Sequence, residues 1–404
     1  MALSALYLDA GEHSVLVDGG VIAALGPGAR APAGAKVLDC RGLSIRPGAV
    51  NAHTHLYSGL APLGMPAPEP PPESFVQILE RLWWRLDRAL DAESLFVSAE
   101  LYLAESLLAG TTALIDHHES PALIEGSLDL LGDAAHSLGC RLATGYGATD
   151  RNGGPEEGRR GLGECRRFAR ENRRPLVRPL AALHASFTVS DETVRLAGGL
   201  GLPVHVHVAE DAADVADAKR RGFAGPLERL LELGALPRGS ILAHGVHLTP
   251  EQVRAADEAG LWLVQNPRSN AGNRVGFAKN LDASRHVALG TDGYPAEMAL
   301  ERAALAEEAE RAGHPLGPEL LAARARGAYA LASELFGVRL EPELSLGAAA
   351  DLAVWGDADK PRHVLVAGEL VVEDGRLTRA DLARIHRNAN AEAPALWQRM
   401  KELR

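Results

Sequence analysis

Short apolar runs alternate with amphipathic stretches through the middle of the chain, from about residue 48 to residue 343. Eight of these runs have the length and aliphatic character of buried strands. They cover residues 45–52, 112–117, 141–146, 176–183, 203–208, 240–243, 262–265 and 287–289. Helical patterns separate most of them, over residues 74–108, 190–199, 211–221, 249–260 and 296–312. Eight strand–helix units predict an α/β fold, a (β/α)8 TIM barrel.

The two ends of the chain show a different pattern, in which Gly and Pro turns separate short strand-like runs. These runs cover residues 5–8, 14–17, 21–25 and 36–39 near the start, and 350–355, 362–368 and 370–377 near the end. We interpret both ends as one small β-sandwich domain, residues 1–48 plus 344–380, partly on the family resemblance described below. The metal-dependent catalytic barrel would then cover residues 49–343, with a C-terminal helix over residues 381–404.

Composition and charge narrow the class of protein. The 404 residues are 46% hydrophobic and 24% charged, which is typical of a soluble globular chain. A net charge of -11 argues against nucleic acid or an anionic membrane as partner. The three cysteines are too few and too far apart for a disulfide framework, so we expect a reducing, cytoplasmic location. The first residues lack the features of a signal peptide.

Histidine is unusually frequent, with 15 residues, and several lie where predicted strands end. Barrel enzymes build their active sites at that edge. His53 and His55 end the first strand and, two residues apart, point to the same side. This pair alone is weak evidence, because chance often produces it in a chain so rich in His. His207 ends the fifth strand, and Glu210 follows at a place suited to a proton shuttle.

Two further strand ends carry candidate ligands. His244 ends the sixth strand, and Asp292 lies in a Gly turn after the eighth. Each has an ordinary alternative, as a lone strand-end His or a turn Asp. Together, however, the candidates occupy four strand ends in barrel order: His53, His55, His207, His244 and Asp292. Imidazole nitrogen and carboxylate oxygen suit one divalent ion, Zn²⁺ first, with Fe²⁺ or Mn²⁺ as alternatives.

With these residues in place, the sequence resembles the amidohydrolase superfamily, in its mononuclear aminohydrolase and chlorohydrolase branch. The resemblance covers nearly the whole chain. The residues that carry it are His53-Thr54-His55, His207 with Glu210, His244 and Thr291-Asp292, supported by Leu183-His184-Ala185, Asn266–Asn270 and Gly347–Trp355. The segments Trp83–Asp87 and Ile115–His118 look most like the SsnA subgroup of aminohydrolases.

The resemblance implies roles for individual residues. One divalent metal ion would be bound by His53, His55, His207 and Asp292. Glu210 would shuttle a proton, His244 would orient the attacking water, and His184 would face the substrate. The family fold is a barrel with a β-sandwich from both termini. One branch of the superfamily bridges two metals with a Lys on strand four, but none of the five lysines lies in residues 176–183, which disfavours that branch.

Substrate contacts are less sharply indicated. Trp84, beside a Pro-rich loop after the first strand, could stack on a flat ring, although packing into the core is an open alternative. His117 and His118 end the second strand on opposite sides, so we expect only one in the pocket. We favour His118, because it shares a face with Asp116.

These observations predict a hydrolase acting on carbon–nitrogen bonds. The expected reaction is hydrolytic deamination of a nitrogen heterocycle, a purine, pterin or related ring, by a metal-activated water. Asp292 would accept the proton of the water while Glu210 protonates the ring nitrogen. Hydrolysis of a cyclic amide or a carbon–halogen bond is the second reading, and an inactive barrel serving as a binding module is the third. The expected partner is a small-molecule substrate, and a homo-oligomer stays open.

Overall fold

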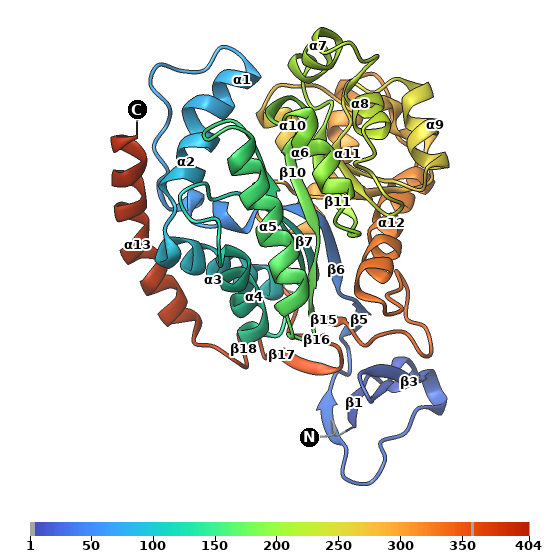
Figure 1. Cartoon of the computed structure of the whole chain (residues 1–404). Coiled ribbons are helices and arrows are strands. Elements are labelled where there is room, and N and C mark those ends of the chain that lie inside the picture. The colour runs from blue at the N-terminus through green and yellow to red at the C-terminus, as the bar shows by residue number, and fades with distance from the viewer. Residues whose placement is uncertain (1–4, 357–358, 404) are drawn as a thin grey trace.

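A parallel eight-stranded barrel forms the body of the molecule (Figure 1). The computed structural model describes residues 5–356 and 359–403. The barrel strands follow one another in chain order, and a bridge between Thr54 and Asp292 joins the first to the last. They are β6 (Ala49–Thr54), β7 (Thr111–His118), β8 (Arg141–Ala148), β10 (Ala181–Ala185), β11 (Val204–Val208), β12 (Ile241–His244), β13 (Trp262–Gln265) and β14 (Val287–Leu289). The predicted (β/α)8 barrel is confirmed.

Helices surround the strands, as the alternating pattern requires (Figure 1). Several begin at a side-chain cap, and the predicted start at Thr249 is a capping box in which Thr249 and Gln252 bind each other's backbone. The helices after β6 to β14 are α3 (Ala92–Leu108), α4 (Ser127–Leu138), α5 (Pro155–Glu171), α6 (Asp191–Gly198), α7 (Ala212–Arg220), α8 (Pro226–Glu232), α9 (Pro250–Glu258), α10 (Pro267–Gly272), α11 (Met298–Arg311) and α12 (Pro318–Phe336).

Two of the expected strands are each divided in the structure. Residues 45–52 form the end of β5 (Ser44–Pro47), which pairs antiparallel with β15 (Leu352–Trp355), and the start of β6. Gly48 lies between them against Thr112, where an added Cβ would be 2.3 Å from the Thr Cγ2 atom. The prediction of one strand was wrong because an apolar run does not show where a chain changes sheets. Residues 176–183 likewise divide into β9 (Val177–Pro179) and β10.

The helical pattern over residues 74–108 also divides. It forms α1 (Phe75–Ile78), a π-helical turn (Leu79–Trp83), α2 (Trp84–Ala89) and α3. The break before α3 is set by Asp91, whose side chain accepts a hydrogen bond from the Ser94 amide and caps the new helix. The turn and α2 bring Trp83 and Trp84 over the mouth of the barrel.

The chain ends form two further sheets. The first has the order β3-β2-β1-β4, and the second the order β18-β17-β16-β15-β5. Their remaining strands are β1 (Leu6–Asp9), β2 (Val15–Asp18), β3 (Val21–Leu25), β4 (Lys36–Asp39), β16 (His363–Val366), β17 (Glu369–Glu373) and β18 (Arg376–Leu377). The two sheets share one apolar core, which joins Leu8 and Val15 to Leu352 and Val354.

The last helix, α13 (Leu382–Glu402), lies beside α2 and α3 (Figure 1). Its Trp397 Nε1 donates to the Leu63 carbonyl at 3.1 Å. Arg399 Nε donates to the Ala89 carbonyl at 2.9 Å. The helix therefore packs on the segments that follow β6. No helix among residues 5–356 and 359–403 is both long and apolar enough for a transmembrane span.

A buried ion pair links the barrel to the sheet of the C-terminal strands. Arg141, on β8, binds both carboxylate oxygens of Asp351 at 2.7 and 2.9 Å. Asp351 directly precedes β15, and its Oδ1 also accepts the Ala367 amide at 2.9 Å. Removing one partner of a buried pair leaves an uncompensated charge, which costs far more than the loss of a solvated pair.

We therefore expect Asp351→Ala to lower the free energy of unfolding by about 3–5 kcal/mol. The measurement is the urea denaturation midpoint followed by circular dichroism. Glu125→Ala is the matched control, because Glu125 pairs with Arg160 on the exposed surface and its loss should change the midpoint little. Equal shifts in both variants would contradict a special role for the buried pair.

Candidate metal centre and active site

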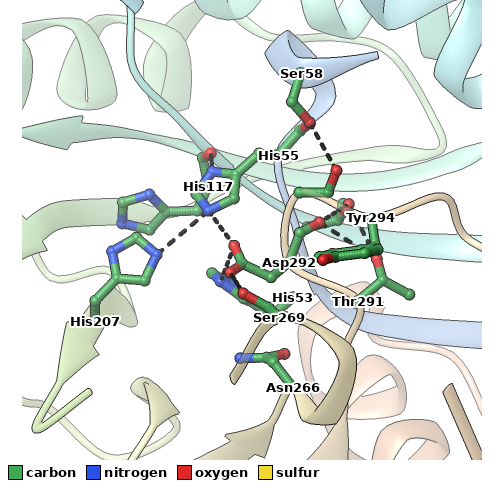
Figure 2. A network of polar contacts seen from close by, with 12 residues as sticks. His53, His55, Ser58, His117, His207, Asn266, Ser269, Thr291, Asp292 and Tyr294 are labelled. Carbon is green, nitrogen blue, oxygen red and sulfur yellow. Dashed lines mark hydrogen bonds and ion pairs between the residues drawn. The ribbon is translucent and has the colours of Figure 1, made fainter. Parts of the chain in front are cut away.

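The predicted ligands converge at the carboxyl ends of the barrel strands. The two residues nearest each other are His55 and Asp292, with Nε2 and Oδ1 at 2.8 Å. His53 Nε2 lies 3.4 Å from the same oxygen, and His207 Nε2 lies 3.3 Å from His55 Nε2. Figure 2 shows His55 in contact with both Asp292 and His207. Ligands about 2.0–2.2 Å from a tetrahedral zinc ion are separated by roughly these distances, so the four side chains fit one ion.

His244 completes the group from β12. Its Nε2 lies 4.0 Å from Asp292 Oδ2 and 3.5 Å from Glu210 Oε2. The donor atoms of His53, His207, His244 and Asp292 all lie within 4.8 Å of one another. The backbone at His244 and Asp292 has φ of 73° and 55°, the left-handed region that non-Gly residues seldom adopt. Both side chains are therefore turned inward by sharp bends at the strand ends.

The second nitrogen of each ligand imidazole is also engaged. His55 Nδ1 donates to the His117 carbonyl at 2.6 Å, and His207 Nδ1 donates to the His184 carbonyl at 2.5 Å. His53 Nδ1 lies 2.9 Å from His205 Nε2. A carbonyl can only accept, so for His55 and His207 the hydrogen is on Nδ1. The lone pair on Nε2 is then left for a metal ion, and the ring cannot rotate away.

Burial and the contacts with Asp292 together set the charge of each residue in the cluster. It lowers the pKa of His53 to about 3, and it lowers the pKa of His207 well below its usual range, so both rings are neutral. Burial opposes ionisation of Asp292, but hydrogen bonds with His53 and His55 hold the pKa of its carboxyl well below normal. Against burial, the same contact with Asp292 raises the pKa of His55 to about 9, and metal binding would displace that proton.

The pKa of Glu210 shifts in the opposite direction from that of Asp292. Burial raises the pKa of its carboxyl to about 7, although His244 acts in the other direction. Its Oε1 accepts a hydrogen bond from Asn273 Nδ2 at 3.2 Å. Two carboxyls therefore face the same cluster in different states, with Asp292 ionised and Glu210 able to hold a proton near neutral pH.

A cavity of about 600 Å³ opens above the cluster. Its floor includes His55, His207, Glu210 and Asp292. Most of the remaining wall is apolar and comes from the Pro-rich loop, α1, the π-helical turn and the loop after β10, with Pro62, Met65, Pro68, Phe75, Leu79, Trp83 and Phe187. A mostly apolar pocket with a few convergent polar groups is typical of a small-molecule site.

Trp84 and His184 both line this cavity. Trp84 Nε1 donates to His184 Nε2 at 3.4 Å, while His184 Nδ1 contacts the Thr188 hydroxyl at 2.9 Å. Burial lowers the pKa of His184 to about 3, so the ring is neutral. Two of the residues predicted as substrate contacts thus lie together on one wall.

The third predicted contact, His118, is placed elsewhere. It is not among the residues that line the cavity; its ring packs between Tyr57 and Tyr146, and its Nε2 contacts Ser120 Oγ at 2.8 Å. His117 takes the inward position instead, with its ring centroid 4.4 Å from that of His207. The preference for His118 assumed that the face of the strand that carries Asp116 and His118 points inward. In the structure the ring of His117, which lies between those two residues, points inward instead.

Sequence reasoning missed several polar residues at the cavity, among them Glu119 and Asn273. Glu119 directly follows β7 and is buried, with Oε1 only 2.7 Å from His117 Nδ1. A carboxylate directly after His117 and His118, at the end of a predicted strand, was the available signal. Asn273 follows α10 and gave no comparable signal.

Comparison with known proteins identifies the family of the chain. The model of the amidohydrolase family matches residues 44–371. This chain belongs to the amidohydrolase family. A 5'-deoxyadenosine deaminase of Methanopyrus kandleri is 30% identical over 396 residues, which cover 87% of this chain and 86% of that protein. An 8-oxoguanine deaminase of Pseudomonas aeruginosa is 28% identical, with 96% of each chain covered.

The crystal structure of an adenosine deaminase from Xanthomonas campestris with bound zinc superimposes with a TM-score of 0.80. It is 26% identical, and the match covers 98% of this chain and 97% of that one. These comparisons support the superfamily predicted from the sequence. They do not distinguish the SsnA subgroup, which stays a prediction.

The convergent donors predict that His207→Ala removes most of the bound metal. Elemental analysis after zinc loading and gel filtration should give about one ion per chain for the unaltered protein and well under half that for the variant. His247→Ala is the matched control, because His247 is an exposed residue three positions beyond His244. Full metal content in His207→Ala would exclude this cluster as the site.

Proposed function

We propose that this protein is a metal-dependent aminohydrolase that removes an amino group from a nitrogen heterocycle, such as a purine or pterin. One observation carries the proposal. A buried carboxyl that can hold a proton, Glu210, lies in the same cavity as a cluster fitted to a divalent ion. The three similar proteins described above are named as deaminases of purine compounds, which supports the same reaction class.

We assign His53, His55, His207 and Asp292 as ligands of one zinc ion. When bound, such an ion lowers the pKa of a coordinated water and supplies a nucleophile near neutral pH. The protein's own contribution is to hold the ligands rigidly, through the carbonyl contacts of His55 and His207, and to keep the cavity apolar.

The two carboxyls divide the proton transfers. Asp292 is ionised and accepts the proton of the attacking water, while the Ser269 hydroxyl binds its Oδ2. Glu210 donates a proton to the ring nitrogen beside the attacked carbon, which makes that carbon a better electrophile. His244, 3.5 Å from Glu210, orients the water between them. A new C–O bond forms, the C–N bond breaks after a further proton transfer, and ammonia leaves.

The wall of the cavity suits a flat ring. Trp84 offers an aromatic face and His184 a neutral imidazole, fixed against each other at 3.4 Å. The apolar side chains around them bury the rest of the substrate without competing for its polar groups. We therefore assign Trp84 and His184 to substrate binding.

Replacing Glu210 by Gln should abolish turnover while metal content stays normal. The Gln side chain keeps the shape but cannot transfer the proton, so we expect kcat to fall by roughly 10²–10⁴-fold. The assay is ammonia release by the zinc-loaded protein from a panel of amino-purines, amino-pyrimidines and pterins.

The control is Glu232→Gln on the exposed side of α8, which should retain the full rate. Near-normal turnover in Glu210→Gln would show that another group moves the proton. A zinc-loaded protein that releases no ammonia from any ring would instead refute deamination.

A further inference from the structure

A second carboxylate, Glu119, lies in the cavity without a part in the chemistry above. It follows β7, whereas Glu210 follows β11, so the two carboxyls come from different sides of the barrel. One oxygen of Glu119 lies within 4.8 Å of nitrogens of both His184 and His207. A ligand seated at the metal cluster is therefore within reach of Glu119 as well.

The position of Glu119 is built by its neighbours. Its Oε1 is buried 2.7 Å from His117 Nδ1, and the other nitrogen of that ring donates to the Leu183 carbonyl at 2.9 Å. Gly147 on β8 makes room for the pair, because a Cβ there would lie 2.6 Å from His117 Cε1 and 2.7 Å from Glu119 Oε1. A side chain larger than hydrogen at this position would displace both residues.

The contact between Glu119 Oε1 and His117 leaves the other carboxylate oxygen, Oε2, as a hydrogen-bond acceptor. His117 Nε2 carries a hydrogen because it faces a carbonyl, so any further proton of the pair is shared between Nδ1 and Oε1. Oε2 then carries none; it lies 3.7 Å from His55 Nδ1, and Glu119 is one of the residues that line the cavity. That Nδ1 already donates to the His117 carbonyl. An acceptor this buried needs a donor, and a substrate can supply one.

A second metal ion beside Glu119 fits the neighbouring side chains less well than a donor group of the substrate does. His55 Nδ1 and His117 Nε2 both donate to carbonyls, so neither is free to ligate. Among His55, His117 and Glu119, that leaves His117 Nδ1 and the carboxylate, which are two donor groups where a protein site offers three or four. His184, also near Glu119, accepts from Trp84 through Nε2 and contacts Thr188 through Nδ1. Asp87, a further carboxylate that lines the cavity, is paired with Arg151.

We infer that Glu119 Oε2 accepts a hydrogen bond from an N–H or a second amino group on the six-membered ring of the substrate, and so selects heterocycles that carry such a donor. The inference rests on the proposed deaminase function and narrows its substrate class. Oxo-amino and diamino rings, such as guanine, isoguanine, 2,6-diaminopurine and pterins, present that donor. Adenine presents only acceptors on the edge of its six-membered ring, apart from the amino group that leaves.

The test compares 6-aminopurines that differ in the group at C2. We expect the zinc-loaded protein to deaminate isoguanine or 2,6-diaminopurine with kcat/KM at least about 10-fold above that for adenine. Glu119→Gln should lower this ratio roughly 10- to 100-fold, because a charge-assisted hydrogen bond is lost, with adenine little affected. Glu164→Gln, a buried carboxylate on α5 paired with Arg167, is the control and should leave the ratio unchanged.

Several outcomes would overturn the inference. An unchanged ratio in Glu119→Gln would show that Oε2 does not contact the substrate. Equal loss on all rings together with loss of metal would assign Glu119 to positioning His55 and His117. Two metal ions per chain, falling to one in the variant, would assign it to a second metal.

A protein that turns over no ring refutes the proposed function, and calorimetric binding of the same purines then tests Glu119 by itself. Tighter binding of the donor-bearing rings that disappears in Glu119→Gln supports the inference, and equal binding overturns it. If Glu119→Gln does not fold, Glu119→Asp retains the charge but withdraws the acceptor, and the same ratio should fall.

Discussion

The contact between an imidazole Nδ1 and a neighbouring strand's carbonyl is the interaction on which the centre depends. His55 reaches the carbonyl of His117 on β7, and His207 reaches that of His184 on β10. Each contact fixes the ring's tautomer and its orientation together. Strand pairing in the barrel sets the positions of those carbonyls, so the ligand geometry is a property of the sheet and not of the histidines alone.

The closure of the barrel and the geometry of the centre depend on the same contacts. The amides of Thr291 and Asp292 both donate to the His53 carbonyl at 2.9 Å, which joins the end of β14 to β6. Gly290 permits this approach, because a Cβ there would lie 2.7 Å from the His53 amide nitrogen. Asp292 is thereby held against His53 and His55. A chain in which this junction failed to form would lose both its last strand contact and a ligand.

The cavity combines an apolar wall with a small number of charged groups in different environments. Asp292 is ionised by contact with two imidazoles, and Glu210 is kept protonatable by burial. Glu119 is paired with His117, and Asp87 is paired with Arg151. The guanidinium of Arg151 also lies 5.0 Å from the centre of the Trp84 ring. In so apolar a setting each charge acts strongly on its neighbours, so the pairing of each carboxylate decides its role.

The sequence by itself determined the alternation of strands and helices, and with it the barrel, because burial repeats with a period that a linear pattern records. It also placed His53, His55, His207, His244 and Asp292 at strand ends, since those positions follow directly from the strand assignments. Only the tertiary structure decided which of His117 and His118 packs against the metal-site histidines: it is His117, whose ring centroid lies 4.4 Å from that of His207. All eight residues of β7 are buried, so hydrophobicity does not distinguish the inner face of that strand from the outer one. The division of residues 45–52 between two sheets and the pairing of Glu119 with His117 likewise depend on partners distant in the chain, and a local pattern carries no information about them.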